Sequence, residues 1–482
     1  MRSTDKSPSA VVRSRLKHPV IDSDGHFIES FPAFLDYLKT VVGADLTSRF
    51  ESAWGNSHIA AQSWYGLTPQ QRYERRATRA PWFTLPTRNT LDRATAMFPK
   101  LLFERLDEMG LDFTVMYPGL GLTAPALQDE EMRRASCRAL NNLYADLFRD
   151  YARRITPVGI IPMHTPREAI EELEHAVTKL GLKAVMMASY VRRPVKAIEA
   201  AYPQAAPYAL WLDTYGIDSE YDYDPVWSKC VELGVAPTFH TAGYGMAWRN
   251  SISNFMFNHI GHFAASAEGL CRSLFMGGVT RRFPTLKCAF LEGGVGWARS
   301  LLSDSLGHWE KRTVQALENY DPAQLDRETL LDLSERFGGP LTALSKVEFL
   351  AASHPEDSTL VDDWGPCQIR GRQDLCNLFV PHFYFGCEGD DPVTASAFDA
   401  RRNPFTARLK AVYGSDIGHW DVPDMREVTS EAYEMVEKQL ISEEDFRDFV
   451  FVNPVELWTG LNRKFFQGTA VENEVKQLLS EK

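Results

Sequence analysis

Carboxylate and imidazole side chains recur at the ends of short β-forming runs in this sequence. The side chains concerned are Asp24, His26, Glu29, His240, Glu292 and Asp416. Histidine mixed with Asp and Glu is the ligand inventory of Zn, Fe and Mn sites. One histidine at a strand end is more often a hydrogen-bonded structural residue, and a buried carboxylate needs only a cationic partner. The joint placement of all six predicts a metal centre.

Further polar residues follow in the same regions of the chain. His259 and His262 are three residues apart on a predicted helix, and we expect His259 to supply one more metal ligand. His262 is expected to support a ligand, contact the substrate or pack in the core. Glu388 follows a later β-forming run and stands close to Asp390 and Asp391. This acidic group predicts a contact with metal or substrate, or a helix cap at Asp390 and a salt bridge.

Two residues downstream of Asp416 suggest proton transfer. His419 lies three residues after Asp416, and Asp421 follows it. We predict that Asp416 and His419 move protons during catalysis, since both residue types act as general acids or bases. Asp421 is expected to orient a ligand or to contact the substrate.

Eight β-forming runs must position these residues, and longer amphipathic segments separate them. Alternation of this kind predicts a (β/α)₈ TIM barrel, an α/β fold in which functional residues gather at the carboxyl ends of the strands. No G-x-G-x-x-G or P-loop motif follows any run, which argues against a nucleotide-binding sheet. The predicted strands are Pro19–Asp24, Asp112–Tyr117, Ile155–Pro162, Lys183–Ala188, Ala236–Thr241, Thr285–Glu292, Asn377–Phe385 and Ala411–Asp416.

Two intervals are too long for simple loops and predict helical caps after strands 1 and 6. We expect an N-terminal arm over residues 1–18 and a single catalytic domain over 19–482, with insertions at about 30–111 and 299–376. The first insertion combines arginines and aromatic residues, which predicts either a pocket for a bulky anion or a cap with a solvated basic face. These residues are Trp64, Tyr65, Arg72, Arg75, Arg76, Arg79, Trp82 and Phe83.

Composition narrows the possible partners of the chain. Its 482 residues are 44% hydrophobic and carry a formal net charge of −12. This charge argues against nucleic acid and anionic membranes and favours a small-molecule substrate. The seven cysteines include no C-x-x-C pair, no run is long enough to span a bilayer, and the polar N-terminus is unlike a signal peptide. We therefore expect a cytoplasmic protein.

The chain resembles the amidohydrolase-related family of metal-dependent TIM barrels. The segments that carry the resemblance are DSDGHFIE, FHTAG, GGVTRRFPTLKCAFLEGGVGWA, YGSDIGHWD and NPVELW. Members of this family usually begin with His-x-His, whereas this chain has Asp24 at the first position. Glu292 stands where many members have histidine, and no lysine closes the fourth strand, which ends in MMASY. The resulting carboxylate-rich ligand set favours Fe or Mn over Zn.

A smaller branch of that family is also similar in DSDGH, NHIGHFA, LEGGVGWA and FGCEGDDP. It includes the nonheme diiron monooxygenase of platensimycin biosynthesis. The resemblance implies two Fe ions, O₂ as co-substrate, an external electron donor and hydroxylation of a bulky substrate such as an acyl-CoA. The alternatives are a Zn- or Mn-dependent hydrolase or non-oxidative decarboxylase, and a metal-free binding barrel. Because such barrels often pair through outer helices, a homodimer is also expected.

Overall fold

The structure is a computed structural model that describes residues 6–57, 64–80, 88–241, 248–321, 324–341 and 362–481. Eight parallel strands form one sheet in the order β1-β2-β3-β4-β7-β8-β9-β10. Their bounds are β1 Ile21–Phe27, β2 Phe113–Pro118, β3 Ile155–Ile161, β4 Ala184–Met187, β7 Pro237–Phe239, β8 Cys288–Phe290, β9 Phe383–Glu388 and β10 Lys410–Gly414. Each of the eight predicted strands overlaps one barrel strand, and their order along the chain is confirmed.

The sheet closes on itself between its first and last strands. The Asp416 backbone N–H donates to the Asp24 carbonyl at 2.9 Å, and the His26 N–H donates to the Ile417 carbonyl at 2.6 Å. Both bonds lie where β10 gives way to the following turn. Closure therefore brings the carboxyl ends of β1 and β10 side by side, as a TIM barrel requires.

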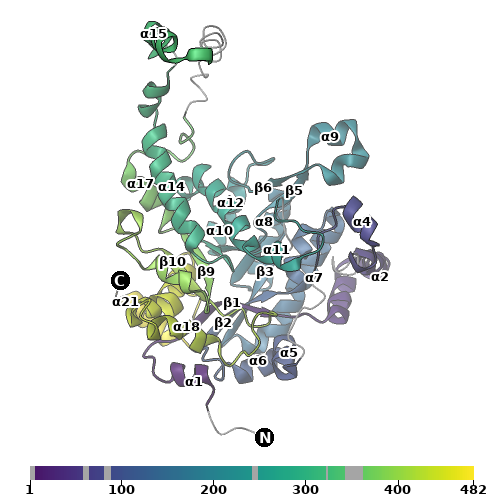
Figure 1. The fold of residues 1–482 in the computed structure, drawn as a ribbon. Helices are drawn as coiled ribbons and strands as arrows, with labels where there is room; N and C mark the ends of the chain where they lie inside the picture. The colour runs from purple at the N-terminus through teal and green to yellow at the C-terminus, as the bar shows by residue number, and fades with distance from the viewer. Residues whose placement is uncertain are drawn as a thin grey trace.

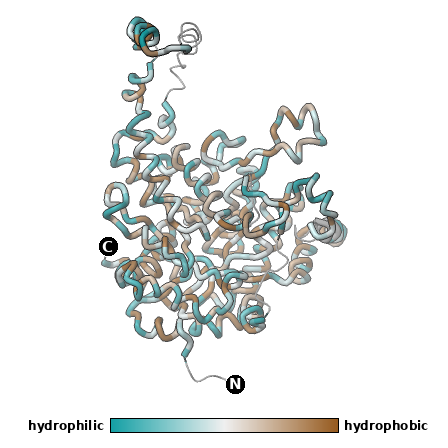
Figure 2. Tube along the Cα trace, viewed as in Figure 1, coloured by the Kyte–Doolittle hydropathy of each residue, from teal (hydrophilic) through white to brown (hydrophobic). Residues whose placement is uncertain are grey.

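The strands are buried because their side chains fill the barrel or pack under the helices. All residues of β1, β2, β3 and β4 are buried. Aromatic rings fill the side of the barrel at β7, β8 and β9, where Phe290 stacks on Phe239 with ring centroids 5.5 Å apart. Hydrophobic segments accordingly concentrate in the interior (Figure 2).

Helices surround the barrel (Figure 1). Those before β7 are α1 Pro8–Arg13, α2 Phe31–Ser57, α4 Pro69–Glu74, α5 Thr90–Met97, α6 Pro99–Arg105, α7 Glu130–Phe148, α8 Pro166–Glu174, α9 Lys196–Ala201 and α10 Asp224–Leu233. Those after β7 are α11 Phe255–His259, α12 His262–Met276, α13 Val279–Arg282, α14 Gly296–Arg312, α15 Arg327–Phe337, α17 Arg372–Phe379, α18 Val428–Glu437, α19 Glu443–Arg447, α20 Asn453–Thr459 and α21 Glu472–Ser480. No described helix is long and apolar enough to cross a membrane.

Two details differ from the sequence-based expectation. The antiparallel pair of β5 (Val191–Pro194) and β6 (Leu210–Asp213) stands outside the barrel sheet and was not predicted. The predicted strand Asn377–Phe385 begins too early, since α17 continues to Phe379 and β9 starts only at Phe383. Pro381 lies between the two elements and disfavours helix at the preceding residue, which separates them.

The predicted insertions correspond to helical segments on the outside of the barrel. The first contains α2, α4, α5 and α6, and the second contains α14, α15 and α17. The part that carries α15 projects from the body of the protein (Figure 1). Of the predicted aromatic–arginine group, Trp82 and Phe83 lie outside the described residues.

Candidate metal centre

Six predicted side chains meet at the carboxyl ends of four barrel strands. Two come from β1, one follows β7, one follows β8 and two follow β10. They are, in chain order, Asp24, His26, His240, Glu292, Asp416 and His419. The barrel thus joins residues that are up to almost 400 positions apart in the sequence.

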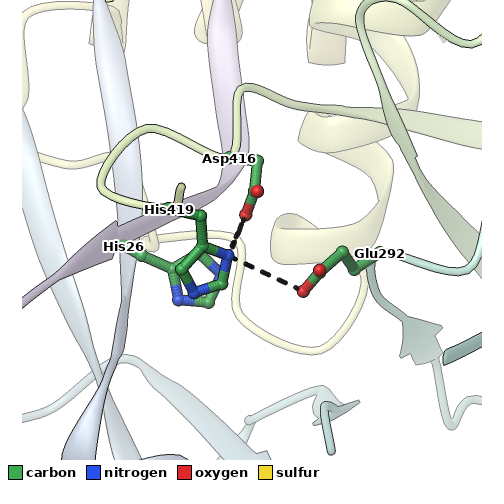
Figure 3. Close-up of side chains that lie close together, drawn as sticks. All are labelled: His26, Glu292, Asp416 and His419. Carbon is green, nitrogen blue, oxygen red and sulfur yellow. Dashed lines mark ion pairs between the residues drawn. The ribbon is translucent and has the colours of Figure 1, made fainter. Parts of the chain in front are cut away.

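Four of these side chains can offer one ligand atom each within 4.8 Å of one another: His26, Glu292, Asp416 and His419. The Nδ1 atom of His419 lies 2.6 Å from Asp416 Oδ1 and 4.0 Å from Glu292 Oε2. Its ring stacks on that of His26 with centroids 3.7 Å apart. Figure 3 shows the two carboxylates pointing toward the stacked rings.

A second group shares His26 and adds Asp24 and His240. The Nε2 atom of His26 lies 3.3 Å from Asp24 Oδ1 and 3.4 Å from Asp416 Oδ1. The Nε2 atom of His240 lies 3.0 Å from Glu292 Oε2. The two groups therefore form one continuous cluster around His26.

The backbone that presents the two central carboxylates is strained. Glu292 has φ 56° and Asp416 has φ 51°, both in the left-handed region that non-glycine residues rarely adopt. Such conformations cost about 1–3 kcal/mol each and concentrate at functional sites. Next to Asp416, Gly418 has φ 94°, and a Cβ there would lie 2.3 Å from the His26 carbonyl oxygen. The close turn that carries His419 therefore requires glycine.

Burial sets the electrostatics of the cluster. It raises the pKa of Asp24 to about 6, and it raises the pKa of Glu292 and Asp416 well above the usual range, with nearby carboxylates adding to the effect. Burial also lowers the pKa of His26 well below its ordinary value. Both directions disfavour the charged form, which is the expected cost of burying such groups without a counter-charge.

The donor atoms of the cluster fit a metal ion. Several are buried and have no hydrogen-bond partner outside the cluster among the described residues: Asp24 Oδ1, the Nε2 atoms of His26 and His240, Glu292 Oε2 and both carboxylate oxygens of Asp416. Buried polar atoms without partners are rare, and carboxylate oxygens beside neutral imidazole nitrogens are what a divalent cation binds. A cation here would offset the burial cost of the carboxylates.

Residues 22–338, more than half of the chain, match the family model described as amidohydrolase. The chain belongs to this amidohydrolase family. This assignment agrees with the barrel and with the metal-type cluster at its rim. It confirms the family resemblance drawn from the sequence but does not test the diiron branch.

This amidohydrolase is similar to one curated relative and several solved structures. It is 24% identical over 156 residues to the 2-amino-3-carboxymuconate-6-semialdehyde decarboxylase of Dictyostelium discoideum, which is 32% of this chain and only 36% of that relative. An amidohydrolase from Mycobacterium avium subsp. paratuberculosis superposes with a TM-score of 0.53 at 17% identity, covering 92% of this chain and 100% of the other. Metarhizium anisopliae IDCase superposes with a TM-score of 0.52 at 11% identity, covering 93% and 98%. The two structures support the fold.

Glu29 is not brought together with the cluster. Its carboxylate accepts hydrogen bonds from the Gly119 and Gly121 backbone N–H groups, both at 3.1 Å, and from the Tyr144 hydroxyl at 2.6 Å. These donors link the end of β1 to the loop after β2 and to α7. The structure therefore does not place Glu29 in the metal-type groups, and its ligand role stays a prediction.

The predicted residues on α11 and α12 lie above or beside the cluster. His259 is half-buried and contacts the rings of Phe263 and Trp420, with centroid distances of 5.6 and 5.5 Å. It lines a cavity of about 340 Å³ that also reaches Glu292. His262 is buried at the start of α12 and packs against Phe263. Neither histidine belongs to the metal-type groups found among the described residues, so the ligand role expected for His259 is not supported by its position.

Glu388 and Asp421 also line this cavity. The helix cap expected at Asp390 is instead formed by Asp391, which accepts a hydrogen bond from the Val393 N–H at 2.8 Å. Glu388 closes β9, and its carboxylate makes no hydrogen bond or ion pair to any described residue. The predicted contact of Glu388 and Asp421 with substrate stays a prediction, and both now share one cavity.

No described residue of the arginine-rich insertion lines the cavity. The Arg72 and Arg79 guanidinium carbons lie 3.5 and 4.0 Å from the centre of the Trp64 ring, so both cations stack on one indole. The Trp64 Nε1–H donates to the Ile252 carbonyl at 3.1 Å, and the Arg79 N–H donates to the Ser251 carbonyl. These contacts attach the insertion to the segment before α11. Arg72 and Arg79 therefore make structural contacts, and the choice between an anion pocket and a cap with a solvated basic face stays open.

Asp22 is a residue that sequence analysis passed over. It is fully buried, and its carboxylate accepts hydrogen bonds from the Thr114 hydroxyl at 2.7 Å, from the Ser415 hydroxyl and N–H at 2.7 and 2.9 Å, and from the Asp24 N–H at 3.1 Å. It thus ties β1 to β2 and to the turn after β10. The D-x-D pattern of DSDGH could have indicated this role, since the carboxylate of the first aspartate accepts a hydrogen bond from the backbone N–H of the second.

Proposed function

We propose that this amidohydrolase is a metal-dependent decarboxylase that removes CO₂ from a small organic acid without an oxidant. The observation that carries the proposal is the convergence of three carboxylates and three imidazoles at the barrel rim. The similarity to the Dictyostelium decarboxylase supports loss of CO₂ over hydrolysis. The neighbouring cavity of about 340 Å³ suits a small substrate.

Five of the six side chains would hold the metal ion, since each is at most 4% exposed. These are Asp24, His26, His240, Glu292 and Asp416. When bound, a divalent ion supplies Lewis-acid polarisation of a substrate oxygen. The mixture of carboxylates and imidazoles suits Mn and Fe as well as Zn.

His419 is the group that we assign to proton transfer. Its side chain is 22% exposed, more than those of the other five residues, and Asp416 Oδ1 holds its Nδ1 at 2.6 Å. When the bond to the carboxyl group breaks, CO₂ leaves and the electron pair stays on the substrate carbon. His419 delivers the proton that this carbon takes up, and regains one from the solvent side.

Anaerobic turnover tests this proposal. Protein loaded with Mn, Fe or Zn is incubated with hydroxy- and amino-substituted benzoates, and released CO₂ is measured. We expect CO₂ release in the absence of O₂. Product that forms only with O₂ and a reductant, without CO₂, would overturn the proposal in favour of the diiron monooxygenase predicted from sequence. A hydrolysed amide or ester would favour hydrolysis.

Removal of the metal is expected to abolish turnover and destabilise the protein. A chelator leaves buried carboxylates without a counter-charge, and a metal present at a hundredfold excess over its Kd contributes about 3 kcal/mol of stability. We therefore expect a lower Tm by calorimetry and at least about a tenfold loss of CO₂ release. Adding back Mn²⁺ should restore both. Unchanged activity and Tm in protein shown by mass spectrometry to be metal-free would contradict the prediction.

A further inference from the structure

Two chemically different sets of side chains line the cavity beside the cluster. The aromatic set comes from α11, α12 and the segment after β10: His259, Phe263 and Trp420. The acidic set comes from the ends of β8 and β9 and from the segments after β9 and β10: Glu292, Glu388, Asp391 and Asp421. The cavity therefore joins a flat apolar surface to an acidic one.

No lysine or arginine is among the described residues that line this cavity. The charged neighbours that act most strongly on Glu388 are themselves carboxylates, namely Glu292, Asp421, Asp390 and Asp24, and with burial they raise its pKa. The Arg249 side chain, close behind Gly261, donates to the Ile260 carbonyl at 2.9 Å. When ionised, these carboxylates repel anions and attract cations, and a bound cation in turn favours their ionised form.

Two of these carboxylates, Glu292 and Glu388, have oxygen atoms that accept no hydrogen bond from the described residues. The Glu292 side chain is 3% exposed and its Oε2 accepts no hydrogen bond from the described residues, although His240 Nε2 lies 3.0 Å away. A metal ion accounts for Glu292 but not for Glu388, which lies outside the metal-type groups and has no bonding partner in the described chain. A group that donates hydrogen bonds is what Glu388 lacks.

The aromatic side chains suit a flat substrate. The His259 ring stands edge-on to the rings of Phe263 and Trp420, with interplanar angles of 78° and 86°. Aromatic rings make favourable contacts with another planar group, and their faces favour a nearby cation. The aromatic and the acidic side chains together thus favour one kind of ligand, a planar apolar body that carries positive charge.

We propose that the cavity selects substrates with an ammonium or other cationic nitrogen group on a flat apolar body, with that group facing Glu388. Resting on the proposed decarboxylation, the same substrate turns its carboxyl group toward Glu292 and Asp416. Selection of this kind disfavours acyl-CoA, whose phosphates would meet the carboxylates that line the cavity. The expected substrate is therefore an amino-bearing aromatic or conjugated acid, and an additional anion would weaken binding.

Binding of three matched benzoates to the Mn²⁺-loaded full chain tests this selectivity. The ligands are 4-(aminomethyl)benzoate, 4-(hydroxymethyl)benzoate and terephthalate, which share one carboxylate and differ in the charge of the opposite group. Isothermal titration calorimetry at low salt measures each Kd. We expect the aminomethyl compound to bind at least about tenfold more tightly than terephthalate, with the hydroxymethyl compound between them. Glu388→Gln should reduce this ratio at least about threefold, whereas the exposed neighbour variant Asp390→Asn should change it less.

Several results would overturn the inference. They are equal or reversed affinities, an unchanged ratio in Glu388→Gln, no measurable binding of any of the three, or loss of metal rather than of amine affinity in that variant. The last result would make Glu388 a metal ligand, and mass spectrometry of the same samples detects it. Because affinity is measured without turnover, the selectivity can hold while decarboxylation fails. Efficient turnover of dianions that the aminomethyl compound does not inhibit would refute the selectivity alone.

Discussion

Replacement of Asp416 by asparagine is expected to lower turnover by at least about 100-fold and to reduce the metal content of the purified protein. Asp416 Oδ1 lies 3.4 Å from His26 Nε2 and 2.6 Å from His419 Nδ1, so one carboxylate serves both the metal-type group and the proton-transfer histidine. The amide has nearly the same shape but no negative charge. The variant should therefore fold normally while losing metal and catalysis together.

Metal analysis by mass spectrometry and initial rates of CO₂ release measure these effects. Asp390→Asn is the matched control, because Asp390 is an exposed aspartate near the same rim and outside the metal-type groups. We expect the control to retain its metal. A Asp416→Asn protein with full metal content and wild-type rates would remove Asp416 from the site. Full metal content with slow turnover would restrict its role to orienting His419.

Replacement of Asp22 by alanine is expected to lower the free energy of unfolding by about 3–5 kcal/mol, because several buried donors lose their acceptor at about 1–3 kcal/mol each. Those donors belong to Thr114, Ser415 and Asp24. The loss should be greater than for most single substitutions, which cost about 0.5–3 kcal/mol. The reason is that this carboxylate bridges β1, β2 and the turn that closes the barrel.

Urea unfolding followed by circular dichroism measures this loss. Asp146→Ala is the control, since the Asp146 side chain is 45% exposed and should contribute less than about 1 kcal/mol. If Asp22→Ala does not fold, Asp22→Asn keeps one acceptor oxygen and should give an intermediate loss. Stability within about 1 kcal/mol of wild type in both Asp22 variants would show that the network is not essential to barrel closure.

The barrel could be predicted because its signals are local. Each core strand is a short apolar or β-branched run between helical segments, and the family assignment agrees with the (β/α)₈ architecture. The start of the predicted strand at Asn377 was wrong. An apolar run continues there from helix α17 through Pro381 into β9, so hydrophobicity alone does not mark where the helix ends and the strand begins. The β5–β6 pair was missed because it lies outside the alternation of strands and helices.

The candidate site was predictable in part for the same reason. Polar residues that follow core strands must meet at one end of a parallel barrel, and Asp24, His26, His240, Glu292 and Asp416 do so. Glu29 does not join them, and spacing along β1 does not reveal the Gly119, Gly121 and Tyr144 donors to its carboxylate. These donors come from other elements, and only the fold brings them to the carboxylate.

The sequence by itself determined the fold class and the residue types at the barrel rim. The reason is that strand formation depends on the pattern of neighbouring residues, and ligand chemistry depends on the type of each side chain. Tertiary structure alone decided which carboxylates are free to bind a cation and which are already used. It separated Asp22 and Glu29, whose oxygens accept several hydrogen bonds, from Glu292 and Asp416, which have buried oxygens without hydrogen bonds. It also placed Glu388 in one cavity with aromatic rings, since the lining of a cavity is assembled from segments that are distant in the chain.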